Sequence, residues 1–530
     1  MKRGAAIAFF CLGAAACGPP PRPPHATPAS VDIARARAEE RPRGFAWSPW
    51  SDETFARARR ENKFLLIDGA AEWCHWCHVM DETTYRDPEV ARALRERFVA
   101  IKVDIDARPD IGDRYAAWGW PATVILGPDA EELGKYRGYL APEKLREILA
   151  TVATKKADLS TEPDEVAAPV DALPWLFARV GRDLDAYWDA EEGGWGKRQK
   201  APLGENVDVE LLRASRGDES ARARAAFVLK QQRKLIDPVW SGIYQYSAGA
   251  TWDEPHFEKL MTMQAAAIEA YAHGAAVLRD PVLLGDAIGL ARYVERFLTD
   301  SRGAFLPSQD ADVNAHEATR PFVDGHVFYS KDDAGRRALG LPRVDPNAYP
   351  HENGLAIAAF VALFEISRDA RWLALARRAA DVMLASNVGA DGRVRRDDGP
   401  NAIRHLGDAA WLGRGLVRLA EATAEPRYRD AAIAIAKRLD DDFAGPKGTL
   451  LSHTEDPAAA GVFARRTTSF SHSVGAARFL AGLARLTGEP RDRDRARALL
   501  AAIATPSRLE AQGRWLGGYL LAIDEAGAAR

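Results

Sequence analysis

Cysteine is scarce in this chain and is confined to two places. Of the four cysteines in 530 residues, Cys11 and Cys17 lie near the N-terminus, and Cys74 and Cys77 lie in the segment WCHWCH. So few thiols cannot build the disulfide network that holds small extracellular domains together. A single C-x-x-C pair in a long chain is instead typical of redox chemistry, a metal site or haem attachment.

The chain also lacks an excess of charge of one sign. Its 72 basic and 75 acidic residues give a formal net charge of -3, which offers no electrostatic footprint for nucleic acid, and we exclude that class of partner. Beyond the N-terminus there is no long apolar run. The longest, residues 355–364, is far too short to span a bilayer and predicts a buried helix.

The N-terminus predicts export. Lys2 and Arg3 precede a short apolar run, which is typical of a signal peptide. The run ends in small residues directly before Cys17 and resembles the bacterial lipobox, in which the cysteine is lipidated and becomes the new N-terminus. We therefore expect residues 1–17 to be a signal peptide with a lipobox, in which Cys11 is discarded and Cys17 carries the lipid. An ordinary signal peptide cut near Ala16 is the alternative.

The segment that follows predicts a spacer. Residues 18–44 contain the Pro-rich stretch GPPPRPPHATPAS, which cannot pack into a core and would act as a semi-rigid tether. Together these features place the expected protein on the periplasmic side of the bacterial envelope. Its contact with the membrane would be through the lipid anchor alone.

Residues 45–155 alternate between helical and extended periodicity, which predicts an α/β layer domain. Helices are expected at 52–62, 88–98 and 142–152, and strands at 64–69, 99–106, 122–126 and 133–136. Cys74 follows the first strand directly and opens a helix, whose free N–H groups and positive dipole end stabilise a thiolate. Cys74 is the predicted nucleophile, and Cys77 would resolve the mixed disulfide.

The segment LLIDGAAEWCHWC resembles thioredoxin. The resemblance implies that Asp68, six residues before Cys74, is a buried carboxylate that exchanges a proton with Cys77, with a pKa raised by burial. A strand-end turn residue is the alternative interpretation of Asp68. It also implies that Pro121, in the segment Trp-Pro-Ala-Thr, is a cis-proline that faces the cysteines and shapes the substrate groove.

The residues around the cysteines differ from thioredoxin, which has Gly-Pro between its cysteines. His75, as an imidazolium beside Cys74, would favour the reduced form and make the pair more oxidising. Alternatively, His75 and His78 are solvated residues on a helix face. The segment Cys74–His78 also fits the haem motif C-x-x-C-H, but it leaves no room for a haem pocket between a buried strand and a helix.

Zinc binding by the two cysteines and two histidines is equally disfavoured, because all four ligands would come from one five-residue stretch. We therefore expect no metal and no cofactor other than the Cys74–Cys77 disulfide. The substrate would be a partner protein that carries a thiol or a disulfide.

After a polar linker at 156–170, residues 171–530 become almost wholly helical. Similar amphipathic segments recur near 278, 367, 424 and 487, each predicted to be the second helix of a hairpin. Gly-containing apolar segments lie between them, at 193–196, 241–247, 303–312, 448–453 and 517–522. This pattern predicts an all-α (α/α)6 toroid, similar to the six-hairpin glycosidases, with its loops around a central cleft.

From about residue 45 the chain resembles the spermatogenesis-associated, thioredoxin-domain proteins, which join a thioredoxin-like domain to such a toroid. The resemblance lies in the segments CHWCHVM, FVAIKVDIDARPDI, WPATVIL, YSAGATWDEPHFEKL, SQDAD and NGLAIAA. It implies a multidomain architecture with residues 45–155 as the thioredoxin-like part. The activity of that family is not well defined, so the resemblance implies the architecture more than the reaction.

Similar toroids in glycosidases and sugar epimerases use acids or histidines from such loops, which makes His256, Glu258, Asp310 and Asp312 the candidate residues of the toroid. Pro255 also fits the first turn of a helix, in which Glu258 would simply complement the dipole, and the two aspartates would then be loop caps. A ligand cleft would take its aromatic walls from Trp195, Tyr244, Tyr246 and Trp252.

Three functions compete on this sequence. The first is an exported thiol/disulfide oxidoreductase that uses one C-x-x-C pair, with the toroid binding its substrate. The second is a carbohydrate-active or carbohydrate-binding toroid with an accessory thioredoxin domain. The third is a non-catalytic assembly protein, for which Cys74→Ser would cause no loss of function.

Overall fold

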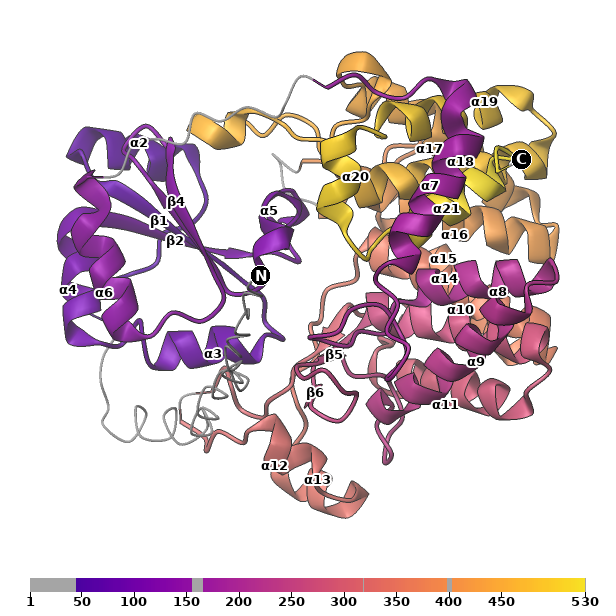
Figure 1. Ribbon diagram of the computed structural model, residues 1–530. Coiled ribbons are helices and arrows are strands. Elements are labelled where there is room, and N and C mark those ends of the chain that lie inside the picture. The colour runs from indigo at the N-terminus through magenta and orange to yellow at the C-terminus, as the bar shows by residue number, and fades with distance from the viewer. Residues whose placement is uncertain (1–43, 155–164, 318, 398–402, 530) are drawn as a thin grey trace, which may run out of the picture.

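The computed structural model describes residues 44–154, 165–317, 319–397 and 403–529 (Figure 1). The predicted signal peptide, its lipobox with Cys11 and Cys17, and the Pro-rich tether lie outside these residues. So does most of the predicted linker. Among the described residues, no helix is long and apolar enough to cross a membrane.

The N-terminal part is a four-stranded sheet with helices on its faces. The strand order is β2-β1-β3-β4, with β1 and β2 parallel and the other neighbours antiparallel. The predicted strands are confirmed, with β1 fully apolar apart from Asp68 and Gly69 because it is buried on both faces. The strands are β1 Phe64–Ala70, β2 Phe98–Asp104, β3 Ala122–Leu126 and β4 Glu132–Arg137.

Within the described part of the N-terminal domain, five helices accompany the sheet; the three with predicted bounds are confirmed within a residue, and so is the helix predicted to begin at Cys74. They are α2 Asp52–Glu61, α3 His75–Glu82, α4 Pro88–Arg97, α5 Pro109–Tyr115 and α6 Pro142–Thr151. Three of them begin with proline, whose fixed φ and missing N–H suit the first turn. The short α5, which the periodicity did not predict, lies on the side of the sheet that faces the second domain (Figure 1).

The second domain is a closed ring of six helical hairpins. The inner helices contact one another in the cyclic order α8, α10, α14, α16, α18, α21 and back to α8, and each pairs with one outer helix. The predicted toroid is therefore confirmed. The inner helices are α8 Gly204–Ser215, α10 Met261–Leu278, α14 Pro350–Ser367, α16 Leu406–Thr423, α18 Phe470–Thr487 and α21 Gly517–Glu525.

The outer helices are α9, α11, α15, α17, α19 and, paired with α21, the first helix of the domain, α7. The C-terminal helix thus closes the ring against the N-terminal ones. The bounds of the outer helices are α7 Leu173–Asp185, α9 Glu219–Gln232, α11 Pro281–Phe297, α15 Ala370–Ser386, α17 Pro426–Phe443 and α19 Pro490–Ala502; the short α20 Pro506–Gln512 precedes α21.

The recurring sequence segments begin at the turns of four hairpins and continue through the second, outer helix of each, as predicted. Each inner helix ends at a residue in the left-handed conformation, then an acidic residue caps the outer helix, and in three of the four a proline begins it. The left-handed residue stops one helix and the acid complements the dipole of the next. The four left-handed residues are Arg279, Arg368, Ala424 and Gly488.

Four of the five predicted Gly-containing connections are loops, and one prediction was wrong. The segment 517–522 forms most of α21, because its apolar residues fill the last gap in the inner ring. The longest connection, between α11 and α14, carries β8 Ser308–Gln309, α12 Gly325–Tyr329 and α13 Asp333–Leu339. In Figure 1 this connection extends beneath the thioredoxin-like domain, toward α3.

The two domains are docked by side chains from both. Phe463, from the loop between α17 and α18, lies in the apolar core beside the sheet with Trp50 and Phe55. Arg108 pairs with Asp456 at 2.7 Å, in the same loop. Apolar burial and charge therefore hold the thioredoxin-like domain against the toroid.

Candidate functional site

The C-x-x-C pair lies where β1 gives way to α3. Cys74 is the N-cap of α3, and its sulfur accepts a hydrogen bond from the Cys77 N–H at 3.2 Å. The two cysteines form a disulfide, with Cα atoms 5.2 Å apart. Both are buried, at 4% and 3% exposure, and Leu260 of the toroid packs on the apolar cluster that contains them. The toroid therefore covers the disulfide.

Two thioredoxin-like features accompany the pair. The bond between Trp120 and Pro121 is cis, as predicted, and leads into β3. Asp68 is a buried residue of β1 whose Oδ1 has no hydrogen-bond partner and whose Oδ2 lies 3.7 Å from Lys102 Nζ. Burial raises the pKa of Asp68 to about 6, which the Lys102 charge only partly opposes.

The toroid supplies charged partners to the histidines of the motif. His75 Nδ1 lies 2.7 Å from Asp312 Oδ2, and the His75 N–H donates to Glu258 Oε1 at 3.3 Å. The other oxygen of Asp312 accepts the Gly325 N–H at 2.9 Å. His75 is thus neither a solvated helix-face residue nor a neighbour of Cys74 alone. It joins the two domains.

The charges at this junction set the protonation of His75. Burial opposes its charged form, but the Asp312 carboxylate outweighs burial and raises the pKa of His75 to about 9. The same pairing lowers the pKa of Asp312 well below its usual range. At neutral pH the residue after Cys74 is therefore an imidazolium, held by a buried carboxylate.

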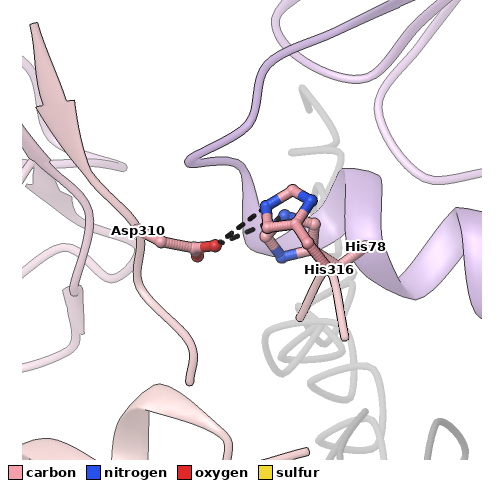
Figure 2. Close-up of side chains that lie close together, drawn as sticks. All are labelled: His78, Asp310 and His316. Carbon is pink, nitrogen blue, oxygen red and sulfur yellow. Dashed lines mark ion pairs between the residues drawn. The ribbon is translucent and has the colours of Figure 1, made fainter. Parts of the chain in front are cut away.

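A second cluster adjoins the first. Asp310, at the end of β8, lies 3.6 Å from His78 of α3 and 3.3 Å from His316, measured from Oδ2 to each Nε2 (Figure 2). His78 Nδ1 lies 3.3 Å from Asp312 Oδ2. His78 is buried, so for both histidines the prediction of a solvated helix face was wrong.

The remaining toroid candidates lie beside this junction or in the core. His256 stacks on Tyr246 with ring centroids 4.2 Å apart, and its Nδ1 lies 3.8 Å from Glu258 Oε2. Pro255 and His256 form β6, which pairs with β5 Tyr246–Ser247, so Glu258 does not belong to the helical first turn that Pro255 suggested. Trp252 is fully buried, and its indole N–H donates to the Glu192 carbonyl.

A separate cavity of about 290 Å³ lies within the ring. Its walls come from the N-terminal halves of the inner helices and carry aromatic, imidazole and charged side chains. They include Trp411, His351, His472, Glu205, Glu269 and Arg478, together with Trp515 before α21. The aromatic residues expected from the sequence do not line it. No periodic or motif signal marked these residues, because they are single positions on apolar helices.

Known proteins match both domains. Residues 37–167 match a family model described as Thioredox_DsbH, protein of unknown function, DUF255. The chain is 30% identical to spermatogenesis-associated protein 20 from Homo sapiens over 318 residues, which cover 52% of this chain and 40% of that protein. The resemblance to the spermatogenesis-associated thioredoxin-domain proteins is confirmed. The match spans less than half the length of these curated relatives.

Two further comparisons concern the domains separately. An 84-residue stretch, 15% of this chain and 14% of the relative, is 32% identical to thiol:disulfide interchange protein DsbD 2 from Pseudomonas aeruginosa. The solved structure of cellobiose 2-epimerase from Spirochaeta thermophila superposes with a TM-score of 0.50 at 12% identity, over 67% of this chain and 96% of that one. The second likeness establishes the toroid fold alone.

Proposed function

We propose that this protein is a thiol–disulfide oxidoreductase whose reactive pair, Cys74 and Cys77, works at the junction with the toroid. The observation that carries the proposal is the Cys74–Cys77 disulfide at the start of α3, beside a His75 that Asp312 keeps charged. The relationship to DsbD, a thiol:disulfide interchange protein, supports the same chemistry.

The proposed reaction needs only the two cysteines and the substrate, and its electrons and protons balance between them. In the reduced protein, the Cys74 thiolate attacks one sulfur of a substrate disulfide, and the other substrate sulfur leaves as a thiolate that takes up a proton. Cys77 then attacks Cys74, which restores the Cys74–Cys77 disulfide and releases the second substrate thiol. The substrate gains the two electrons that the cysteine pair loses, and in the opposite direction the same steps oxidise a dithiol.

The surroundings supply the rest of the proposed machinery. Asp68, with its pKa raised to about 6, would accept and return the Cys77 proton, and Pro121 would shape the groove beside the pair. The His75 imidazolium would stabilise the negative sulfur of Cys74. Because Leu260 packs on the cysteine pair and Glu258 and Asp312 hold the adjoining His75, a protein substrate would have to displace this part of the toroid.

Trapping tests the proposal. In a Cys77→Ala variant expressed in its native cells, the mixed disulfide on Cys74 cannot be resolved and should accumulate. Non-reducing electrophoresis and mass spectrometry would then show either a protein partner or a small thiol on Cys74. The Cys74→Ser/Cys77→Ala double variant is the control. A Cys77→Ala protein that stays free of any adduct on Cys74, while parent and variant behave alike in the cell, contradicts the proposal.

The central cavity favours a second candidate function, the binding of a carbohydrate. Trp411 and Trp515 offer flat apolar faces, while Glu205, Glu269 and Arg478 offer charged groups that hydrogen-bond to hydroxyls. A cavity of about 290 Å³ suits a ligand of roughly monosaccharide size. The fold likeness to cellobiose 2-epimerase is consistent with such a ligand but does not identify it.

Sugar binding is tested by titrating the protein with a panel of neutral and acidic monosaccharides and disaccharides, followed by tryptophan fluorescence and calorimetry. A ligand in the cavity should saturate the parent and bind at least tenfold more weakly to Trp411→Ala. Trp175→Ala, at an exposed position outside the cavity, is the matched control. If no sugar saturates the parent, the cavity is not a carbohydrate site.

A further inference from the structure

The cluster at Asp310 presents three ligands of the kind that hold a transition metal. His78 Nε2, His316 Nε2 and Asp310 Oδ2 all lie within 4.8 Å of one another. Their closest approaches, 3.3 and 3.6 Å, are near the separation of about 3.3 Å expected between ligands at 2.0 to 2.1 Å from a tetrahedral zinc ion. Figure 2 shows both imidazoles directed toward the same carboxylate.

One of the two oxygens of the Asp310 carboxylate makes no hydrogen bond. Asp310 is 2% exposed, and its Oδ1 accepts the Asp312 N–H at 2.9 Å, which fixes the group in place. Its Oδ2, which faces the two histidines, is buried and has no hydrogen-bond partner. The two imidazoles lie 3.3 and 3.6 Å from this oxygen as ion-pair partners, and a cation between the carboxylate and the imidazoles would bind the oxygen directly.

The surroundings orient His78 as a ligand. Asp312 Oδ2 lies 3.3 Å from His78 Nδ1, so the carboxylate can accept a hydrogen bond from Nδ1–H and select the tautomer whose Nε2 lone pair is free for a metal. The carbonyl oxygen of Glu72 lies 3.0 Å from His78 Nε2 and 2.8 Å from His316 Nε2, so a fourth oxygen is at hand. The side chain of His316 is 28% exposed, which gives an ion a route from solvent.

The neighbouring group of His75, Asp312 and Asp324 is a poorer candidate for a metal site, because its carboxylate is already paired. The 2.7 Å contact between His75 Nδ1 and Asp312 Oδ2 is a closed ion pair, and the Gly325 N–H satisfies the other oxygen of Asp312. No oxygen of Asp312 is therefore left for an ion. The two clusters share Asp312 but differ in chemistry.

We propose that His78, Asp310 and His316 form a binding site for a divalent transition metal, zinc by its donor set, that bridges the thioredoxin-like domain and the toroid. Two imidazoles and one carboxylate are ligands that zinc accepts, with the Glu72 carbonyl or a water in the fourth position. From the sequence a metal was not expected, because the candidate ligands lay in one five-residue stretch. In the folded protein the partners of His78 are not the cysteines but Asp310 and His316, which lie more than 230 residues further along the chain.

The bridge has a mechanical consequence. His78 follows Cys77 directly on α3, whereas Asp310 and His316 belong to the connection between α11 and α14. A bound ion therefore fastens that connection over the disulfide. Removing the ion should make the disulfide easier to reach by an external reductant, whether or not the pair acts as an oxidoreductase in the cell.

The test is zinc binding by the full oxidised chain, stripped with a chelator and titrated with zinc alone, with the bound metal counted by mass spectrometry. One zinc per chain is expected, with affinity lower by about tenfold or more in His316→Ala and in Asp310→Asn. His273→Ala, which alters an imidazole paired with Asp208 elsewhere in the toroid, should bind zinc like the parent. Circular dichroism checks that the variants fold.

Two more measurements test whether the cysteines bind the metal and whether the bound ion protects the disulfide. Binding should persist in Cys74→Ser/Cys77→Ser, and cobalt in place of zinc should give a tetrahedral spectrum without thiolate charge-transfer bands. Reduction by dithiothreitol should be several-fold slower with zinc than without it in the parent, and unchanged by zinc in His316→Ala. The proposal is overturned if the parent binds no zinc, if His316→Ala and Asp310→Asn bind it as tightly as the parent, or if binding requires the cysteines.

Discussion

At the scale of single residues, the chemistry of the junction comes from buried charges that are only partly paired. Asp68, His75 and Asp312 are each held away from water, and the pKa of each is set by the balance between burial and its charged partners, with burial prevailing at Asp68 and the ion pair prevailing at His75 and Asp312. Asp312 is held by His75, His78 and the Gly325 N–H and stays ionised. At Asp68, burial and the Asp81 charge outweigh Lys102, so the pKa is raised and the acid form persists toward neutral pH.

Asp68 therefore makes folding depend on pH. Burial raises its folded pKa to about 6, above the value of 3.8 for an unpaired carboxyl, so the group favours folding only at low pH. The destabilisation caused by the ionised Asp68 grows as pH rises between these two values and reaches its full size above pH 6. Asp68→Asn should consequently be more stable than the parent by about 3 kcal/mol at pH 8, with little gain near pH 3.5.

Chemical denaturation of the oxidised protein at the two pH values measures this difference. Asp129→Asn, at an exposed turn between β3 and β4, should show no such gain at either pH. The same Asp68→Asn substitution should slow thiol exchange, since the amide cannot accept a proton. Equal stabilities of parent and variant at pH 8 would show that Asp68 is not a destabilising buried acid.

At the scale of elements, local signals in the sequence were enough wherever one helix or strand determines its own limits. The hairpin turns illustrate this, because a left-handed residue followed by an acid and, in most cases, proline is readable at 279, 368, 424 and 488. Helix α21 illustrates the opposite. Its segment 517–522 looks like a glycine-containing loop and becomes helical because the ring requires a sixth inner helix.

The same distinction explains the site. Asp68, Cys74, Cys77 and Pro121 were identified from contiguous motifs that a single chain segment carries. Asp310 and Asp312 were identified as residues of interest but assigned to a sugar site, since nothing in the sequence shows that their loop reaches α3. The contact of Asp312 with His75 depends on how two domains dock, across 237 residues.

Ring closure provides a prediction at this scale. Arg478 of α18 pairs with Glu205 of α8 at 2.8 Å and with Glu525 of α21 at 2.7 Å, and its side chain is 6% exposed. Arg478→Met keeps the apolar stem and removes the charge, which leaves two carboxylates facing each other. We expect a loss of about 2 kcal/mol, less than for a fully buried pair because Glu205 is partly exposed.

Thermal or chemical unfolding gives the comparison. The control is Arg337→Met, which removes the exposed pair with Asp333 and should cost much less stability than Arg478→Met, because solvent screens that pair. If the two variants lose the same stability, the Arg478 network does not hold the ring closed.

At the scale of the whole molecule, the reactive disulfide is controlled by how the domains fit together. The thioredoxin-like domain alone would expose the edge that carries Cys74, whereas here the toroid covers it (Figure 1). Phe463 is the largest apolar contribution of the toroid to the opposite side of the sheet domain, where it is 3% exposed among Trp50, Phe55 and Tyr115. The contact at Phe463 and the cover over the disulfide join the same two domains.

Weakening the domain contact at Phe463 should therefore expose the disulfide. Phe463→Ala removes a buried aromatic side chain at a cost of about 3 kcal/mol, and the loss falls on the contact between domains. Below the unfolding temperature, we expect dithiothreitol to reduce the Cys74–Cys77 disulfide several-fold faster than in the parent.

Phe360→Ala is the matched control, because it removes an equally buried ring within the toroid and should lower stability without speeding reduction. Equal acceleration in both variants would mean that reduction follows general unfolding, and equal rates in Phe463→Ala and parent would mean that the cover does not depend on docking.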